Sequence, residues 1–337
     1  MRVSGLRGTR HREREGERTL AKFILKRILV AIPVLLIISI LVFLLMQLAP
    51  YDAIDTMINP RMSPEQIEAL RDRYGYNDPL WVQYFAWLKN ILSFDFGYSI
   101  TTKDSVAAQL LTRIPHTIML VLPAYLTAYV LAIVLGIVAG SHRGSRADKI
   151  IDGIASIGIS IPTFWFSMLL IFVFGYWLGW LPIVGMQTVG DGSALDVARH
   201  YILPFVTLTV AFLPDNLRYV RSSTITQMTQ DYVQVQRAFG AKRAQIMFRH
   251  VCRNVLVPVV TRLGMAMPLL VTGAIITETI FSWPGVGPYF MTAIKSMDYP
   301  VVMAVLVLSS TLVVLGNLLA DVLCALIDPR VRQGGAR

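Results

Sequence analysis

The chain has 337 residues, of which 55% are hydrophobic and only 15% are charged, and its mean hydropathy is +0.57. Soluble globular proteins carry about 25% charged residues, so this composition excludes an ordinary soluble protein. The net charge of +10 does not indicate nucleic acid binding, because the basic residues gather in the N-terminal tail, in 218–262 and at the C-terminal end. That distribution is typical of a chain whose main partner is the lipid bilayer.

Six apolar segments predict spanning helices, so the predicted fold class is an all-α membrane protein with about six transmembrane helices. Four segments are free of charged residues and long enough to cross a hydrocarbon core of about 30 Å, namely 28–49, 117–141, 154–189 and 299–320. Two weaker segments, 202–219 and 263–280, contain prolines and the acidic residues Asp215 and Glu278. We include both, because otherwise two long apolar segments would have no membrane to bury them.

The distribution of charge predicts the orientation and the organisation of the chain. Basic residues favour the cytoplasmic side, which places both termini and 218–262 there and the slightly acidic 50–113 outside. The first apolar segment is too long for the core of a cleaved signal peptide and predicts a retained anchor. We therefore expect a basic cytoplasmic tail (1–22), a first transmembrane helix (23–49), an extracytoplasmic loop with short helices (50–114), a five-helix core (115–328) that includes a cytoplasmic segment (222–257), and a cytoplasmic C-terminal tail (329–337).

Several residues at membrane depth are candidates for a polar passage. Small and polar residues open the third apolar segment, and ionisable groups inside spanning segments are functional-site hypotheses by default. Packing against a neighbouring helix remains an alternative for each of them. The candidates for the passage are Ser160, Pro162, Asp215, Asn216 and Glu278.

After the fifth segment, the sequence FSWPGVGPYF is too rich in glycine and proline for a regular helix and predicts a tight outer turn. We expect this turn to close over the outer end of the passage. The candidate residues of this outer gate loop are Trp283, Pro284, Gly285 and Gly287.

The cytoplasmic segment predicts two amphipathic helices with a bend at Gly240. Asp231 suits a helix N-terminus, and a glycine suits the position just after a helix end. Tyr232 and Phe239 are expected to project from the tip, and the second helix is expected to carry Ala244, Met247, Phe248 and Val251 on one stripe. Two interpretations stay open at this point: the helix pair rests on anionic lipid, or it docks on a protein.

Matching stretches run along nearly the whole chain, among them LKRILVAIPVLLIISILVFLL, RIPHTIMLVLPAYL, SIPTFWFSMLL, DYVQVQRAFGAKRAQIMFRHVCRNVLVPVVTRLG and ETIFSWPGVGPYF. In this order they resemble the permease subunit of ATP-binding-cassette importers, in the oligopeptide and dipeptide branch and its B-type permease. The resemblance implies the type I importer permease fold. It also implies a channel-forming subunit that couples ATP hydrolysis by partner subunits to peptide translocation by alternating access.

The resemblance further implies a bacterial cytoplasmic membrane and an assembly of several subunits. The implied partners are a homologous second permease, two ATPase subunits, an extracytoplasmic solute-binding protein and a peptide substrate. The chain has no GxxxxGK[ST] sequence, so ATP and Mg are expected on the ATPase partners, and no cofactor, metal or catalytic residue is expected here. A secondary transporter driven by an ion gradient is the alternative, whereas a membrane enzyme is disfavoured because HExxH and GxSxG patterns are absent.

In such permeases the segment that here surrounds Gly240 resembles the coupling helix, which sits in a groove of the ATPase subunit. This chain departs from the common pattern at Gln234 and Gln236, where the general importer pattern has Glu and Ala, and at Phe239, where the peptide branch usually has Lys. The residues implied in ATPase coupling are Asp231, Tyr232, Val235, Arg237, Ala238, Phe239, Gly240, Arg249, His250, Arg253 and Asn254.

Overall fold

The computed structural model describes residues 5–48, 58, 62–73, 75–265 and 274–327. The secondary structure within these ranges is helical, apart from an isolated bridge between Tyr98 and Ser105, which confirms the all-α class for this part of the chain. The predicted C-terminal tail and most of 49–61 lie outside the described residues.

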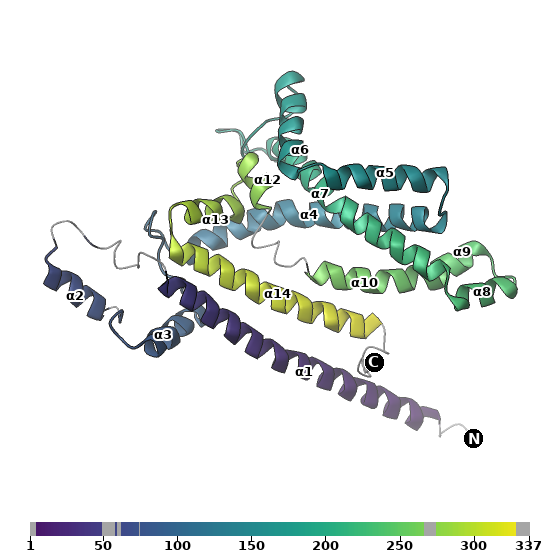
Figure 1. Cartoon of the computed structure of the whole chain (residues 1–337), viewed down its shortest axis with the longest axis horizontal. Helices are drawn as coiled ribbons and strands as arrows, with labels where there is room; N and C mark the ends of the chain where they lie inside the picture. The colour runs from purple at the N-terminus through teal and green to yellow at the C-terminus, as the bar shows by residue number, and fades with distance from the viewer. Residues whose placement is uncertain (1–4, 49–57, 59–61, 74, 266–273, 328–337) are drawn as a thin grey trace.

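The helices follow one another along an elongated molecule (Figure 1). Their bounds are α1 (Gly5–Gln47), α2 (Pro64–Arg73), α3 (Leu80–Leu92), α4 (Val106–Ser141), α5 (Arg146–Ser160), α6 (Thr163–Leu170), the π-helix η1 (Ile171–Trp177), α7 (Ala194–Met228), α8 (Asp231–Ala238), α9 (Arg243–Ile246), the π-helix η2 (Met247–Val251), α10 (Cys252–Met265), α12 (Ile275–Ile280), α13 (Val286–Lys295) and α14 (Tyr299–Ile327).

Four helices are long and apolar enough to cross a membrane: the Ile24–Gln47 part of α1, α4, α7, and the Tyr299–Val322 part of α14. The third expected segment, 154–189, is a broken helix, because α5 and the α6–η1 unit meet at an angle of 97°. The break falls at Pro162, whose ring disfavours helical backbone at the preceding residue, and Ile161 is accordingly extended. The fifth expected segment, 263–280, includes 266–273 outside the described residues, so the count of six remains a prediction.

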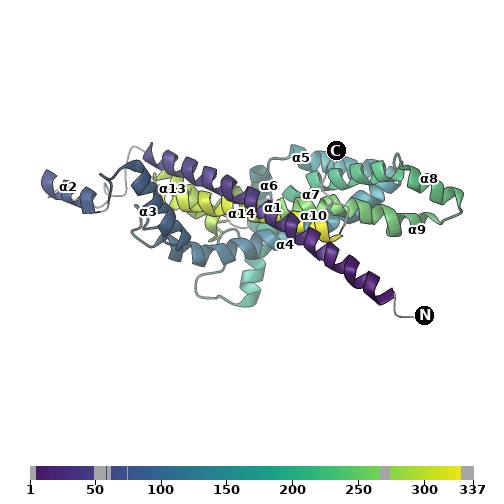
Figure 2. The same ribbon diagram turned by 90° about the horizontal axis from the view of Figure 1, so that it is seen from below.

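Both chain ends lie at the same end of the molecule. The first turns of α1 and the last turns of α14 point toward the end that carries α8 and α9 (Figure 1). Figure 2 shows α1 lying across α14 and extending beyond it, and the Arg27 guanidinium contacts the Asp321 carboxylate of α14 at 2.9 Å. This arrangement agrees with termini that share one side with the segment around Gly240, while the assignment of that side to the cytoplasm stays a prediction.

The centre of the fold is the contact between the two long helices α4 and α7. A Cβ atom added to Gly136 would lie 2.8 Å from Val220, and one added to Gly140 would lie 2.7 Å from the Arg221 carbonyl oxygen. Such distances are far below van der Waals contact, so both positions require glycine for the helix backbones to approach this closely. The small residues four apart in α4 therefore serve helix packing.

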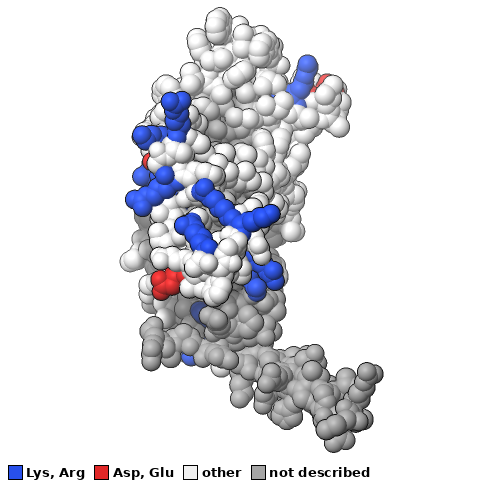
Figure 3. All heavy atoms as spheres, turned by 90° about the vertical axis from the view of Figure 1, so that its right-hand side faces the viewer, with Lys and Arg blue, Asp and Glu red and all other residues white. Residues whose placement is uncertain are grey.

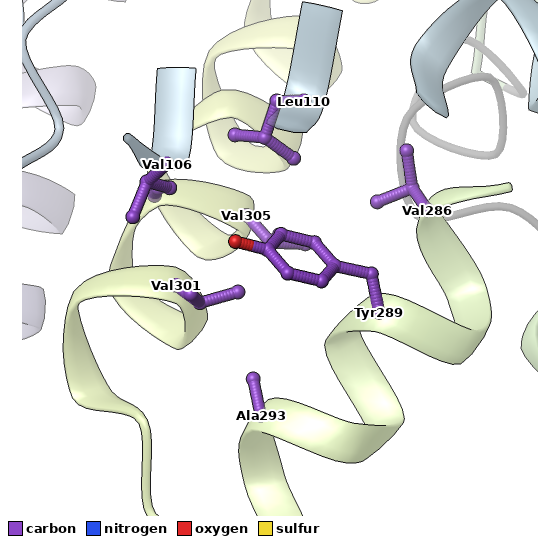
Figure 4. Close-up of a cluster of buried hydrophobic side chains, with 8 residues drawn as sticks. Val106, Leu110, Val286, Tyr289, Ala293, Val301 and Val305 are labelled. Carbon is purple, nitrogen blue, oxygen red and sulfur yellow. The ribbon is translucent and has the colours of Figure 1, made fainter. Parts of the chain in front are cut away.

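A buried apolar cluster packs the N-terminal end of α4 against the C-terminal part of the chain (Figure 4). The Tyr289 ring of α13 lies among Val106 and Leu110 of α4 and Val301 of α14, and the Arg113 guanidinium lies 4.8 Å from the centre of that ring. Burial raises the pKa of Tyr289 to about 12, so its hydroxyl stays protonated at physiological pH. The cluster joins the first and the last helices of the core at one end.

Replacement of Gly140 with Ala should destabilise the protein, because the new methyl group would collide with the backbone of α7. Overpacking of this kind costs about 1–3 kcal/mol, which should lower the thermal unfolding midpoint in detergent. Gly153→Ala on α5 is the matched control, because no described atom lies within 4 Å of the added Cβ and alanine favours helix. Equal midpoints for the two variants would contradict the close approach of α4 and α7.

Candidate functional site

The segment around Gly240 forms the bend that the sequence predicts. Helix α8 begins with Asp231, whose carboxylate suits the positive end of the helix dipole, and it ends at Ala238. Gly240 has a φ of +79°, in the left-handed region that favours glycine, and the chain then turns back into α9. Two short helices with a glycine turn between them thus stand at one end of the molecule.

The surface of this bend combines apolar side chains with positive charge. Phe239 is 87% exposed and Phe248 is 78% exposed, and Val235 is also exposed beside them. Figure 3 shows Lys and Arg side chains gathered over this end of the molecule. The exposed basic residues of the segment are Arg237, Lys242, Arg243, Arg249 and Arg253. We call Val235, Phe239, Phe248 and these five basic residues the tip surface.

Behind the tip surface, a buried apolar cluster connects the bend to the long helices. Val233 of α8 and Val251 of η2 are fully buried against Tyr129 of α4 and Val220 of α7. The same cluster includes Ile246, Met247, Val255 and Val259. Because close-packed cores transmit displacement, a force on the tip surface will move α4, α7 and α10 as well.

Two predicted features of this segment are wrong. Tyr232 does not project; it is half-buried, donates a hydrogen bond to Gln227 (3.0 Å) and accepts one from Asn254 (3.3 Å). Phe248 does not share a stripe with Met247 and Val251, which are buried while Phe248 points outward. The residues from Met247 to Val251 form a π-helix, whose wider turn changes the angular spacing on which the stripe prediction depended.

A second internal contact stabilises the bend. The Gln236 side chain lies 2.9 Å from Nε2 of His250, which links α8 to η2. Gln236 is one of the positions where the chain departs from the common importer pattern, and its side chain faces His250. His250 and Asn254 therefore hold the two arms of the bend together, whereas the exposed Phe239 and Arg249 are free to meet a partner.

Some of the candidate passage residues have exposed side chains, and others are buried. Asp215 is 75% exposed at its side chain, and its carboxylate contacts the Arg262 guanidinium of α10 at 2.5 Å. Ser160 and Pro162 are also exposed, and the Ser160 hydroxyl donates to the carbonyl oxygen of Ser156 in its own helix. Asn216 is buried and donates to the Phe212 carbonyl oxygen at 2.8 Å, which is the packing alternative.

Glu278, the remaining candidate, is completely buried and lines no exposed surface. One of its carboxylate oxygens accepts a hydrogen bond from the Gly287 backbone N–H at 2.8 Å. A Cβ atom on Gly287 would lie 2.7 Å from that oxygen, so the close approach requires glycine here. Glu278 therefore holds the glycine-rich turn in place.

The turn itself is tied to α4. The Trp283 indole donates to the His116 carbonyl oxygen at 2.9 Å, and the Val286 N–H donates to the Thr117 hydroxyl at 2.8 Å. His116 Nδ1 lies 3.2 Å from the Pro284 carbonyl oxygen. These bonds fix the turn that was expected to be the outer gate loop on the N-terminal half of α4.

Sequence reasoning missed three polar contacts that hold segments far apart in the chain. Arg262 was assigned to the cytoplasmic segment and not to Asp215. The nearly buried Asp148 binds Arg221 at 2.6 Å, and the buried Asp298 accepts a short hydrogen bond from Ser99 at 2.5 Å. Each contact involves an acidic residue, which was the available signal, but nothing in the sequence names its partner.

Among the described residues, no group of three or more His, Cys, Asp or Glu side chains is placed to hold a metal ion. Residues 132–333 match the family described as the inner membrane component of binding-protein-dependent transport systems. Residues 20–121 match the family that describes the N-terminal region of a membrane component of such systems. The chain belongs to this family. The match confirms the resemblance drawn from the sequence and makes the chain a multi-pass inner membrane component.

The relatives of this inner membrane component are permease proteins. It is 39% identical over 314 residues to an oligopeptide transport system permease protein of Bacillus subtilis, covering 93% of this chain and 99% of that one. It is 36% identical to a di/tripeptide transport system permease protein of Pseudomonas aeruginosa, covering 92% and 98%. A glutathione transport system permease protein of Escherichia coli is 35% identical, with the same coverage.

A solved structure shares the fold. The MetNI methionine ABC transporter in an inward-facing conformation matches this inner membrane component with a TM-score of 0.51 at 18% identity, over 65% of this chain and 96% of that one. At this identity the likeness supports the importer permease fold and nothing about substrate.

Replacement of Glu278 with Ala should loosen the turn that contains Trp283 and Gly287. The Gly287 N–H would lose its acceptor, at a cost of roughly 1–3 kcal/mol, and a protease should cleave the turn faster. Glu278→Gln is the control, because its amide oxygen can still accept from Gly287. Cleavage at the parental rate in Glu278→Ala would show that the carboxylate does not hold the turn.

Proposed function

We propose that this inner membrane component is a channel-forming permease subunit of an ATP-driven importer of oligopeptides or dipeptides. The observation that carries the proposal is the tip surface, an exposed bend with apolar and basic side chains that a buried cluster joins to α4, α7 and α10. A partner protein bound to this bend would move these helices with it. Relatives named as oligopeptide and di/tripeptide permeases, each aligned over nine-tenths of this chain, support the substrate class.

The partner that pushes the bend is an ATPase subunit. Exposed aromatic side chains such as Phe239 and Phe248 serve as anchors in a groove, and the surrounding arginines pair with acidic residues at its rim. ATP-driven closure of two ATPase subunits then moves the bend, and the buried cluster passes the movement to α4, α7 and α10. ATP and Mg bind to those partners, and this chain catalyses no reaction itself.

The family of the chain implies the remaining parts of the assembly. A homologous second permease completes the passage, with the exposed Ser160, Pro162 and Asp215 on its lining and the turn at Trp283, Pro284, Gly285 and Gly287 at its outer end. Asn216 and Glu278 support this lining from behind, since both are buried. An extracytoplasmic solute-binding protein delivers the peptide to the outer side, in the cytoplasmic membrane of a bacterium.

The test of the function is transport in proteoliposomes that contain the complete complex. Uptake of a labelled tripeptide should require ATP on the ATPase side and should persist when ionophores abolish the ion gradients. Uptake that survives ATP depletion but collapses with an ion gradient would identify a secondary transporter, which has no support among the relatives. Uptake of no peptide at all would reject the substrate class.

Phe239→Asp should weaken ATPase binding, because it replaces an aromatic anchor with a charged side chain. The fold itself should not change, since Phe239 is exposed. Loss of such an anchor costs about 2 kcal/mol or more, which is roughly 30-fold in affinity, and should reduce co-purification of the ATPase subunit. Phe94→Asp is the control, because Phe94 is also largely exposed but lies in the loop after α3. Equal co-purification of both variants with the ATPase would contradict the docking role.

A further inference from the structure

The exposed ion pair between Asp215 and Arg262 would be unfavourable on a surface that faces lipid. Asp215 lies in the expected spanning segment 202–219, and its neighbour Pro214 packs on Gly158 of α5, which belongs to the expected segment 154–189. A charged side chain within the hydrocarbon costs up to about 2.5–3.5 kcal/mol against lipid. Charged groups that are exposed in a spanning segment therefore face water or another polar surface.

The rest of that face of α7 has the same character. Ala211, Asp215, Arg218, Ser222 and Thr226 are spaced by three or four residues, and all of them are exposed. The opposite face carries buried residues such as Leu208, Leu217 and Val220. The helix is thus apolar toward the protein and polar outward.

Helix α1 shows the opposite pattern, which a lipid-facing helix requires. Its exposed side chains include Leu25, Leu29, Ile37, Leu41 and Leu44. Both helices qualify as spans by length and composition. The difference between their exposed side chains therefore indicates that α1 faces lipid and that α7 faces a more polar environment. The polar face of α7 is therefore a candidate lining of the passage.

The chemistry at this point of the passage suits a molecule with a positive and a negative end. The Arg262 guanidinium has five N–H donors in a planar fork that matches a carboxylate, and it lies 4.6 Å from the centre of the Tyr219 ring. The Asp215 carboxylate accepts hydrogen bonds from an ammonium group. Exposed ion pairs contribute only about 0–1 kcal/mol to stability. Each side chain can therefore leave its partner and bind a ligand at little cost in free energy.

We propose that Asp215 and Arg262 are the contact site for the charged ends of a peptide in transit, with Arg262 binding the C-terminal carboxylate and Asp215 the N-terminal ammonium; this rests on the peptide-import function proposed above. The aromatic rings beside the pair supply an apolar wall. The Tyr125 ring of α4 lies 5.2 Å from the Phe212 ring of α7, and the Tyr125 hydroxyl contacts the Arg262 carbonyl oxygen at 3.5 Å. Charged ends and apolar side chains thus have separate places to bind.

The test measures ATP-driven uptake of three forms of one tripeptide by the reconstituted complex: with free ends, with an amidated C-terminus and with an acetylated N-terminus. Each rate is expressed relative to the parental complex with the same peptide, which removes differences in delivery by the binding protein. Arg262→Gln should lower the relative uptake of the free peptide about tenfold and leave that of the amidated peptide unchanged. Asp215→Asn should lower the relative uptake of the free peptide about tenfold and leave that of the acetylated peptide unchanged.

Arg218→Gln is the matched control, because it removes one positive charge from the same face of α7 three residues away. It should not distinguish the three peptides. Equal losses for all peptides in Arg262→Gln and Asp215→Asn would overturn the terminal-contact role, and loss of the second permease from the purified complex would assign the pair to a subunit interface instead. Absence of any peptide uptake by the parental complex would overturn the proposed function, which is a separate outcome.

A second measurement needs no modified peptide. In a background with Cys252 and Cys324 replaced by Ser, a charged, water-soluble thiol reagent should modify Ala211→Cys, which lies on the polar face of α7 within the expected span 202–219. The free tripeptide should slow this modification in the assembled complex. Leu217→Cys, on the buried face, should react at least tenfold more slowly. Equal rates at the two positions, or no protection by the peptide, would overturn the proposal.

Discussion

The fold depends on the close approach of two helix backbones, α4 and α7, at Gly136 and Gly140. At this contact, Val220 and Thr224 of α7 occupy the space where larger side chains on α4 would stand. The α4–α7 pair then offers two surfaces for packing: Tyr129 and Val220 contact the bend around Gly240, and the N-terminal half of α4 contacts the glycine-rich turn. Both predicted functional elements are therefore mounted on one rigid pair of helices.

Features that depend on local chemistry could be predicted from the sequence. The bend at Gly240 follows from the freedom of glycine at positive φ, and the packing role of Gly136 and Gly140 follows from their spacing in an apolar helix. Three of the long apolar helices, α1, α4 and α14, follow from length and hydropathy alone. Helix α7 was expected on weaker grounds, and the charge-free segment 154–189 is a broken helix. The family resemblance also came from the sequence, because ordered motifs along the whole chain carry far more information than any single one.

Features that depend on tertiary partners could not be predicted. The spacing of apolar residues assumes a regular α-helix, so it misplaced Phe248 where the chain forms a π-helix. Pro162 was predicted as a passage residue, whereas in the structure it interrupts the helix, and the angle of 97° between the two pieces is a property of the tertiary structure. Glu278 was read as a passage residue because buried acids often are, while its position is set by the Gly287 N–H, nine residues away across a turn.

The position of α1 bears on how the protein is made. Its partners include α14, through packing and the contact between Arg27 and Asp321, and α3, through the hydrogen bond between the Ser39 and Tyr84 hydroxyls. A helix that is made early thus docks on one that is made much later. Until α14 has been synthesised, α1 lies in the bilayer without that neighbour, and its exposed leucines are compatible with lipid on that side. Synthesis of α14, and not the early steps of insertion, brings these two helices together.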